Sequence, residues 1–109
     1  MLKCWKVISM ARLWMMMNKC KIEYCDKYTF LKFHCPGCNE SHSLHVAGDD
    51  KAWTWNNSLI NPTISPSYLQ YRDRIHRRCH SQITNGVICY YTDSEHALAG
   101  ECRELPDIC

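Results

Sequence analysis

The chain has 109 residues, nine cysteines, six histidines and a formal net charge of +2. A chain of this length forms one domain with a modest core, and a charge so close to zero does not favour nucleic acid as its general partner. The odd number of cysteines argues against a complete set of disulfides within the chain.

The beginning of the chain differs from the rest. Three consecutive methionines at residues 15–17 precede the first well-patterned stretch, which begins near Lys21. We therefore expect residues 1–20 to be an N-terminal extension, unstructured or added by an upstream start codon, and residues 21–109 to form a single zinc-binding, β-rich domain. The alternative is a short helix that anchors to a partner through Leu2, Trp5, Val7 and Ile8.

We expect neither an export signal nor a membrane span at the start of the chain. Lys6 and Arg12 interrupt the apolar stretch that a signal peptide needs, and the stretch is too short and too charged to cross a bilayer. A reducing, cytoplasmic location follows as the expectation. In such a compartment, clustered Cys and His residues more often bind a metal than form disulfides.

Two alternating stretches flank the sequence Cys-Pro-Gly-Cys at residues 35–38. Residues 28–34 and residues 42–47 each place their apolar side chains mainly on one face, as strands with one buried side do. We expect them to pair antiparallel across the turn between them. Farther along, Trp53 and Trp55 indicate a short strand.

Residues 61–69 contain Pro62 and Pro66, which exclude a helix and disfavour a central strand. We expect an ordered edge or loop there. In residues 79–91, Asn85-Gly86 predicts a hairpin with a two-residue type I′ turn, in which Ile83 lies opposite Ile88. The same alternation sends the adjacent Cys79 and His80 to opposite faces.

Residues 93–100 favour one helical turn, with Asp93 or Ser94 as its N-cap and Gly100 as its end. The expected fold class is therefore mainly β. It is a small antiparallel sheet of hairpins stapled by a zinc knuckle, with one short helical turn near the C-terminus.

The two cysteines of the 35–38 turn, Cys35 and Cys38, are spaced so that their thiolates can converge on one ion. A tetrahedral Zn²⁺ needs two more ligands. We assign Cys79 as the third ligand because zinc prefers thiolates. We assign His42 as the fourth ligand because it lies only four residues after Cys38 in the sequence. Alternatives for the fourth ligand are His80 or His96; the other candidates are His34 and His45 and, less well, Cys89 and Cys102.

We expect this zinc to stabilise the fold and not to catalyse a reaction. Two or three thiolates make a poor Lewis acid for hydrolysis, and structural sites are closed by four protein ligands. The zinc deaminases are an exception, but their H-x-E and P-C-x-x-C motifs are missing here. The alternative of free thiols or a redox pair lacks the strand-helix setting that such a pair needs.

A second group of polar residues remains once the metal is assigned. His80, His96 and Ser81 are the candidate catalytic residues, and a pocket or partner surface is expected from Trp53, Trp55, Thr63 and Ser67. The alternative is that the histidines make structural hydrogen bonds and the tryptophans belong to the core. Nucleic acid could bind through a basic cluster, though it is not favoured: Arg72, Arg74, Arg77 and Arg78.

The ordered pattern FHCPGC, AWTWN, NPTISPS, RRCHSQITNGVI, DSEHALAGE and LPD, from Phe33 to Asp107, resembles a family of small uncharacterised proteins of tailed phages and prophages. Some of its members are mislabelled ammonia monooxygenase. The resemblance implies a phage or prophage origin, a host-cytoplasm location and a zinc-stabilised, β-rich fold, and it supplies no activity.

The leading functional expectation is a zinc-stabilised binding protein that contacts a host or phage macromolecule and modulates host defence. The first alternative is a small hydrolase or transferase with a pocket around His80, His96 and Ser81. The second alternative is a nucleic-acid-binding zinc module, which predicts a strong dependence of binding on salt.

Overall fold

A computed structural model describes residues 18–71 and 77–108 of the chain. The expected extension therefore lies outside the described residues up to residue 17, as do Arg72 and Arg74 of the basic cluster. Residues 18–20 belong to the folded domain: the Lys19 amide donates to the Leu59 carbonyl at 2.7 Å, and the Cys20 side chain is 2% exposed.

The first sheet has three antiparallel strands in the order β1-β2-β3. Phe33 of the middle strand lies opposite Cys20 on one side and opposite His42 on the other, and all three face the core. The two strands predicted around the 35–38 turn are confirmed, whereas the first strand was not expected. The bounds are β1 (Cys20–Cys25), β2 (Tyr28–Cys35) and β3 (Glu40–Ala47).

The second sheet has five strands in the order β4-β5-β6-β7-β8, with every neighbouring pair antiparallel. Its first strand is so short that it pairs only with Ile64 and Ser65 of the next one. The bounds are β4 (Thr54–Trp55), β5 (Ile64–Tyr71), β6 (Arg78–Thr84), β7 (Val87–Tyr90) and β8 (Cys102–Glu104).

The hairpin of β6 and β7 has the predicted register. Ile83 lies opposite Ile88 and Thr84 opposite Val87, which leaves Asn85-Gly86 as the two-residue turn. Both turn residues have positive φ, 54° and 81°, as a type I′ turn requires. Because side chains alternate along β6, one face of the hairpin enters the core and the other faces outward.

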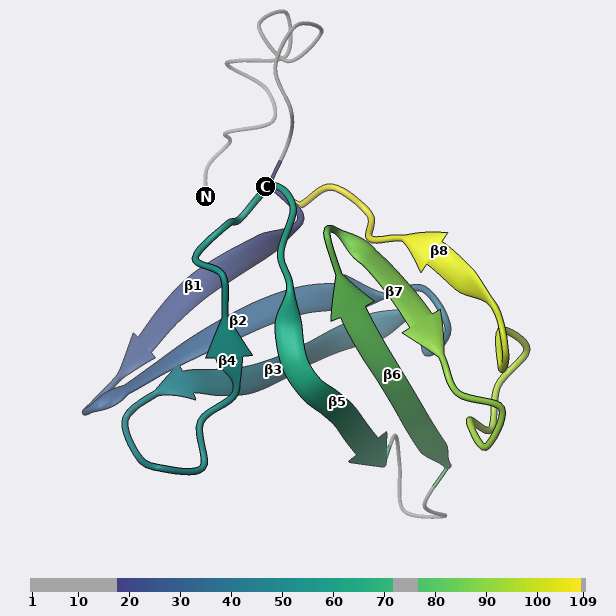
Figure 1. The fold of residues 1–109 in the computed structure, drawn as a ribbon, viewed down its shortest axis with the longest axis horizontal. Coiled ribbons are helices and arrows are strands. Elements are labelled where there is room, and N and C mark those ends of the chain that lie inside the picture. Colours follow the sequence, from purple (N-terminus) through teal and green to yellow (C-terminus); the bar gives the residue numbers. More distant parts are fainter. Residues whose placement is uncertain (1–17, 72–76, 109) are drawn as a thin grey trace, which may run out of the picture.

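The two sheets face each other and their strands cross in the view of Figure 1. Between them lie aliphatic, aromatic and thiol side chains. The Phe33 ring meets the Tyr68 ring edge-on at 6.3 Å, and the Tyr68 hydroxyl donates to the Ser43 carbonyl at 3.1 Å. The mainly β fold class is thereby confirmed.

The predicted helical turn at residues 93–100 is not formed; this segment is a series of turns. Its polar side chains bond to β6 and do not cap a helix. The Ser94 hydroxyl accepts from the His80 amide at 3.0 Å and donates to the His80 carbonyl at 2.9 Å. The chain then leads into β8, which was not expected either.

One pair of cysteines differs from the sequence expectation. Cys89 and Cys102, weaker candidates for metal ligands, lie opposite each other on β7 and β8 and form a disulfide. The free cysteines among the described residues are Cys20, Cys25, Cys35, Cys38 and Cys79.

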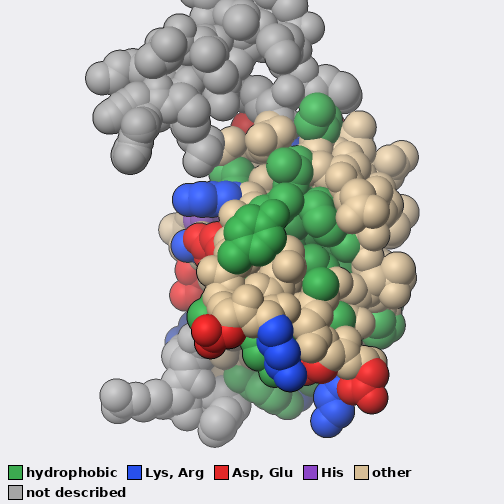
Figure 2. All heavy atoms as spheres, turned by 90° about the vertical axis from the view of Figure 1, so that its left-hand side faces the viewer, with side chains coloured by type: hydrophobic (Ala, Val, Ile, Leu, Met, Phe, Trp, Pro, Cys, Tyr) green, Lys and Arg blue, Asp and Glu red, His purple; other side chains and the backbone are tan. Residues whose placement is uncertain are grey.

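Figure 2 looks at the side of the molecule where β1 and β4 lie and shows a stripe of hydrophobic side chains, with charged side chains to its left and below it. Tyr24 of β1 is the most exposed large hydrophobic residue described, at 77%. Over the described ranges, 18–71 and 77–108, no helix has the length and apolar character to cross a membrane.

Candidate functional site

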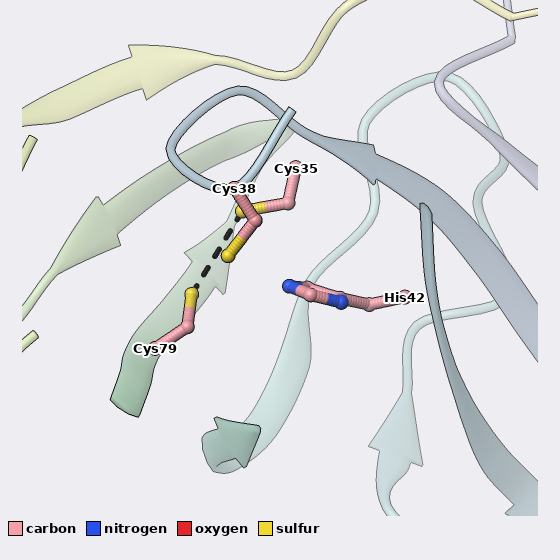
Figure 3. Close-up of side chains that lie close together, drawn as sticks. All are labelled: Cys35, Cys38, His42 and Cys79. Carbon is pink, nitrogen blue, oxygen red and sulfur yellow. Dashed lines mark hydrogen bonds between the residues drawn. The ribbon is translucent and has the colours of Figure 1, made fainter. Parts of the chain in front are cut away.

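Three cysteines and a histidine meet between the two sheets (Figure 3). Cys35 ends β2, Cys38 follows in the turn, His42 lies in β3, and Cys79 comes from β6 of the other sheet. Their ligand atoms all lie within 4.8 Å of one another and all four residues are buried. The structure therefore brings together the four residues that the sequence singled out as zinc ligands.

The knuckle that carries Cys35 and Cys38 is held against β7. Its turn is closed by the Asn39 amide, which donates to the Cys35 carbonyl at 2.7 Å. The Tyr90 hydroxyl accepts from the Gly37 amide at 3.0 Å and lies 3.0 Å from the Cys35 sulfur. Tyr90 thus ties the first sheet's knuckle to the second sheet.

The geometry of the cluster fits a tetrahedral metal ion. The sulfurs of Cys35 and Cys79 are 3.8 Å apart, and two ligands at Zn–S bonds of about 2.3 Å in a tetrahedron are separated by about 3.8 Å. Nε2 of His42 is buried and has no hydrogen-bond partner among the described residues. A buried nitrogen of this kind needs a partner, and a metal ion among the three sulfurs would supply one.

The charge distribution also suits a cation. A hydrogen bond from Cys79 lowers the pKa of Cys35, and this effect outweighs the desolvation that raises it. The same hydrogen bond raises the pKa of Cys79. Desolvation, together with the negative charge of the nearby thiolates, raises the pKa of Tyr68 to about 12. The lowered pKa of Cys35 favours the thiolate, which is the form that binds a metal ion.

Gly37 of the knuckle leaves room for the ring of His96. A Cβ at this position would lie 2.4 Å from Cε1 of His96, and that ring is held edge-on to Tyr90 at 4.5 Å. We expect Gly37→Ala to lower the free energy of unfolding by about 1–3 kcal/mol because the packed ring must move. Urea denaturation measures this loss.

The matched comparison for Gly37→Ala uses its neighbour. A His96→Ala background removes the three atoms nearest to the added methyl group, so the same glycine substitution should cost much less there. An undiminished loss of stability in the double variant would show that the clash with His96 is not the cause.

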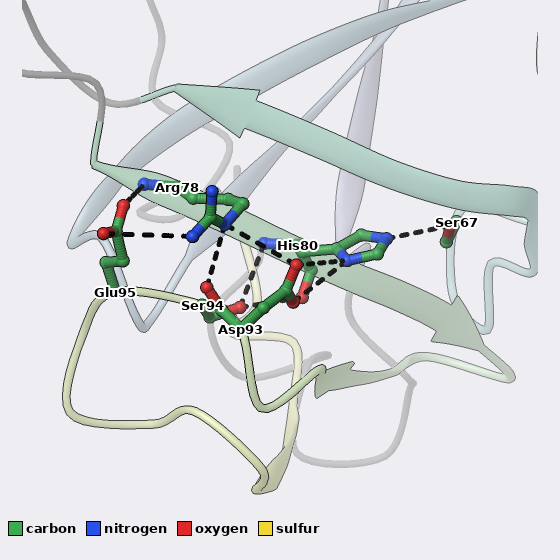
Figure 4. A network of polar contacts seen from close by, with 6 residues as sticks. All are labelled: Ser67, Arg78, His80, Asp93, Ser94 and Glu95. Atoms are coloured by element: carbon green, nitrogen blue, oxygen red, sulfur yellow. Dashed lines mark hydrogen bonds and ion pairs between the residues drawn. The ribbon is translucent and has the colours of Figure 1, made fainter.

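A second group of polar residues lies on the outer face of the same β6 strand (Figure 4). Oγ of Ser67 on β5 is 3.2 Å from Nε2 of His80. Nδ1 of the same ring is 3.1 Å from Oδ1 of Asp93. The three side chains form a hydrogen-bonded series with the imidazole in the middle. Neighbouring members of the series are 13 residues apart in the sequence. This order of contacts is the one in which a histidine activates a serine hydroxyl.

Neighbouring groups fix the imidazole of His80. The Tyr91 ring stacks on it with the centroids 4.2 Å apart. The Ser94 hydroxyl bonds to the main chain of His80 twice, accepting from its amide and donating to its carbonyl. Nε of Arg78 lies 3.0 Å from the Asp93 carbonyl oxygen and 3.5 Å from its carboxylate, so the acidic member is held as well.

Ser67 is held through its main chain. The indole of Trp53 donates to the Ser67 carbonyl at 3.3 Å. The expected pocket residues thus separate into different roles: Trp53 supports Ser67, the Trp55 indole donates to Ser58, and the Thr63 hydroxyl accepts from the Asn85 amide at 2.8 Å.

The structure does not bring the other two catalytic candidates to His80. Ser81 is fully buried on the inner face of β6, with no hydrogen-bond partner for its hydroxyl among the described residues. His96 lies against Gly37 and Tyr90 on that same inner side. Sequence reasoning placed Ser67 only on a pocket surface and read Asp93 as a helix cap. If residues 64–71 had been read as a strand, alternation would have placed Ser67 and Leu69 on the same face. Leu69 lies opposite His80 in the structure.

A family model for the bacterial ubiquitination-like system serine protease (BubE) matches residues 9–91 of the chain. The chain belongs to the BubE family. The match includes the four clustered residues, Ser67 and His80, and it stops two residues before Asp93. No curated protein and no solved structure matches the chain.

The family match tests part of what the resemblance to phage and prophage proteins implied. Membership of a small family is confirmed, and its description names a bacterial system. The phage or prophage origin and the host-cytoplasm location implied by the resemblance stay predictions.

Proposed function

We propose that this BubE-family protein is a serine hydrolase of the protease type, with Ser67 as nucleophile, His80 as general base and Asp93 as the group that orients the imidazole. The observation that carries the proposal is the hydrogen-bonded series from Ser67 through His80 to Asp93. The family description, a serine protease of a ubiquitination-like system, supports the same chemistry. The substrate bond is accordingly an amide in a peptide.

The reaction follows from the positions of the three groups. Oγ of Ser67 attacks the carbonyl carbon of the peptide bond while Nε2 of His80 takes the hydroxyl proton. The imidazolium then gives that proton to the leaving nitrogen, the C–N bond breaks, and the acyl group remains on the serine as an ester. A water molecule, deprotonated by the same imidazole, attacks the ester and releases the carboxylic acid with the serine restored.

Asp93 acts through His80 and not on the substrate. Its carboxylate accepts a hydrogen bond from Nδ1–H, which leaves Nε2 free of a proton and directed at Ser67. It also stabilises the imidazolium that forms during the attack. The side chain is half exposed, so Arg78 and the turn around Ser94 supply the rigidity that burial would otherwise give.

The proposed role of the metal cluster is to hold β6 in place. When bound, Zn²⁺ would join Cys35, Cys38 and His42 of one sheet to Cys79 of the other. Cys79 immediately precedes His80 and faces the opposite way. The inner cluster therefore sets the position of the strand that carries the general base.

We expect Asp93→Asn to lower the turnover of p-nitrophenyl acetate by about 10⁴-fold, since an amide at this position favours the wrong tautomer of the imidazole. The rate of p-nitrophenol release measures the effect. Glu95→Gln is the matched control, because Glu95 contacts Arg78 but is not among the groups that contact His80. Equal losses in the two variants would contradict the assigned role of Asp93.

The expected binding role is a second candidate, supported by the hydrophobic stripe on the side of β1 and β4 (Figure 2). Its partner would be a host or phage protein, and the binding would occur without turnover. A Ser67→Ala variant that keeps every cellular effect of the protein would favour this role over hydrolysis.

A further inference from the structure

The strand that carries Ser67 has an open edge. In the described part of the chain, β4 pairs with β5 only at Ile64 and Ser65. On its other side β5 pairs with β6 along Tyr68–Tyr71. From Tyr68 to Tyr71, β5 therefore has a strand partner on one side only among the described residues, and Ser67 lies in the irregular stretch between Ile64 and Tyr68.

The hydrogen bonds of His80 show which way the N–H and C=O groups of the opposite residue on β5 point. The His80 carbonyl accepts from the Tyr91 amide at 2.9 Å, and the His80 amide donates to the Ser94 hydroxyl. Both groups thus point toward β7, away from β5. Leu69 lies opposite His80, so this is a non-hydrogen-bonded pair, and the N–H and C=O of Leu69 point away from β6 toward the open edge.

The main-chain carbonyl of Ser67 points toward the same edge. Ser67 lies two residues before Leu69, next to the register irregularity between Ile64 and Tyr68, and the direction of its carbonyl is shown by the indole of Trp53, which donates to it. Trp53 immediately precedes β4, the neighbour of β5 on that side. The open edge and the nucleophile therefore belong to the same strand.

Exposed apolar side chains lie on β5 after the nucleophile and beside His80. The described residues include four large hydrophobic side chains that are exposed, and three of them are near the triad: Leu69, Tyr71 and Tyr91, at 46%, 47% and 43%. Leu69 and Tyr71 follow Ser67 at alternate positions of β5, hence on its face, and Tyr91 stacks on His80. The fourth, Tyr24, is in the other sheet.

We propose that the substrate is an extended, apolar peptide segment that binds as an additional antiparallel strand on the open edge of β5. This inference rests on the proposed function, because it takes Ser67 as the nucleophile. An unpaired strand edge with exposed N–H and C=O groups is a template for such a strand. The proposal names the conformation and the side-chain class of the substrate.

The register follows from antiparallel pairing. The scissile carbonyl is placed beside Ser67, whose own main-chain carbonyl is already bonded to the Trp53 indole, and the residue two positions before the one that carries the scissile carbonyl lies opposite Leu69. That second residue exchanges two hydrogen bonds with Leu69, and its side chain lies on the outer face against the Leu69 side chain. The residue between them directs its N–H and C=O away from β5.

Two kinds of serine-directed probe separate this inference from the proposed function. A fluorophosphonate without a peptide reports whether Ser67 reacts at all. The diphenyl phosphonate of acetyl-Leu-Ala-Ala, with phosphorus in place of the scissile carbonyl, reports peptide recognition. Labelling rates of the intact protein are compared for this probe and for a form with Asp in place of Leu. We expect the Leu form to react at least about tenfold faster.

N-methylation tests the edge itself. A methyl group on the Leu nitrogen removes the hydrogen bond to the Leu69 carbonyl and should slow labelling about tenfold, which is the effect of losing one net hydrogen bond. A methyl group on the middle Ala nitrogen is the matched control and should have little effect. Equal rates for the two methylated probes would overturn the edge-strand proposal.

Protein variants complete the test. We expect Leu69→Asp to lower the ratio of the peptide-probe rate to the fluorophosphonate rate about tenfold. Tyr24→Asp, which replaces another exposed large hydrophobic residue, in the other sheet, should leave the ratio unchanged. Fluorophosphonate labelling with no difference among the peptide probes would overturn this inference alone. No fluorophosphonate labelling would overturn the proposed function and this inference with it.

Discussion

Replacing Ser67 with Ala should abolish hydrolysis of p-nitrophenyl acetate, with a loss of at least about 10⁴-fold in turnover. The variant lacks the oxygen that attacks the carbonyl, while the hydrogen bond to the imidazole is a small part of the structure. The far-ultraviolet circular dichroism spectrum and the midpoint of thermal unfolding should stay close to those of the unaltered protein. The rate of p-nitrophenol release is the measurement.

Two other serines serve as controls for Ser67→Ala. Ser65 is exposed on the same strand, so Ser65→Ala should retain most of the activity. Ser81 was the serine expected from the sequence, and it is buried on the inner face next to His80 in the chain. Loss of activity in Ser81→Ala with retention in Ser67→Ala would contradict the assignment of the nucleophile.

The second large effect concerns the metal cluster. Replacing Cys35 with Ser removes one of the four residues that we propose hold a metal ion between the two sheets, and a chelator that removes the metal should have the same consequence. A structural Zn²⁺ contributes on the order of 10 kcal/mol to folding, which is comparable to the whole stability of a small domain. We therefore expect the variant to be unfolded by circular dichroism and to lack stoichiometric zinc by elemental analysis.

Cys25→Ser is the matched control for Cys35→Ser. Cys25 is also a free cysteine, but it is exposed at the end of β1. The control should bind one zinc ion per chain and unfold at the same urea concentration as the unaltered protein. A Cys35→Ser variant that remains folded without metal would contradict the structural role of the ion.

Loss of the metal should also remove catalysis. Cys79 and His80 are adjacent on β6 and face opposite sides of the sheet, so a shift of this strand on loss of the cluster would displace the proposed general base. The proposed function thus depends on the inner cluster through the position of one strand. No metal chemistry is required in the hydrolytic steps.

The parts of the fold that could be predicted are those with local signals. Alternation around the 35–38 turn identified β2 and β3, and Asn85-Gly86 identified the β6-β7 hairpin with its register. The same alternation separated Cys79 from His80. Thiolate preference and spacing then singled out the four residues that the structure brings together.

The parts that escaped prediction depend on tertiary contacts. Pro62 and Pro66 favoured an edge or loop, yet the strand continues to Tyr71 because β6 pairs with it from Tyr68 onward. Asp93 was interpreted as a helix cap from the sequence. Its contact with His80 forms only because the turn after β7 folds against that residue. The pairing of Cys89 with Cys102 needs β8 beside β7, and β8 is three residues long.

The most direct test of the proposed triad is the site of covalent labelling. The intact protein is treated with a fluorophosphonate, digested, and analysed by tandem mass spectrometry. We expect one adduct per chain, on Ser67, and none after prior replacement of His80 with Ala. An adduct on another serine, or no adduct on a folded and metal-loaded protein, would contradict the assignment of Ser67, His80 and Asp93 as the catalytic group.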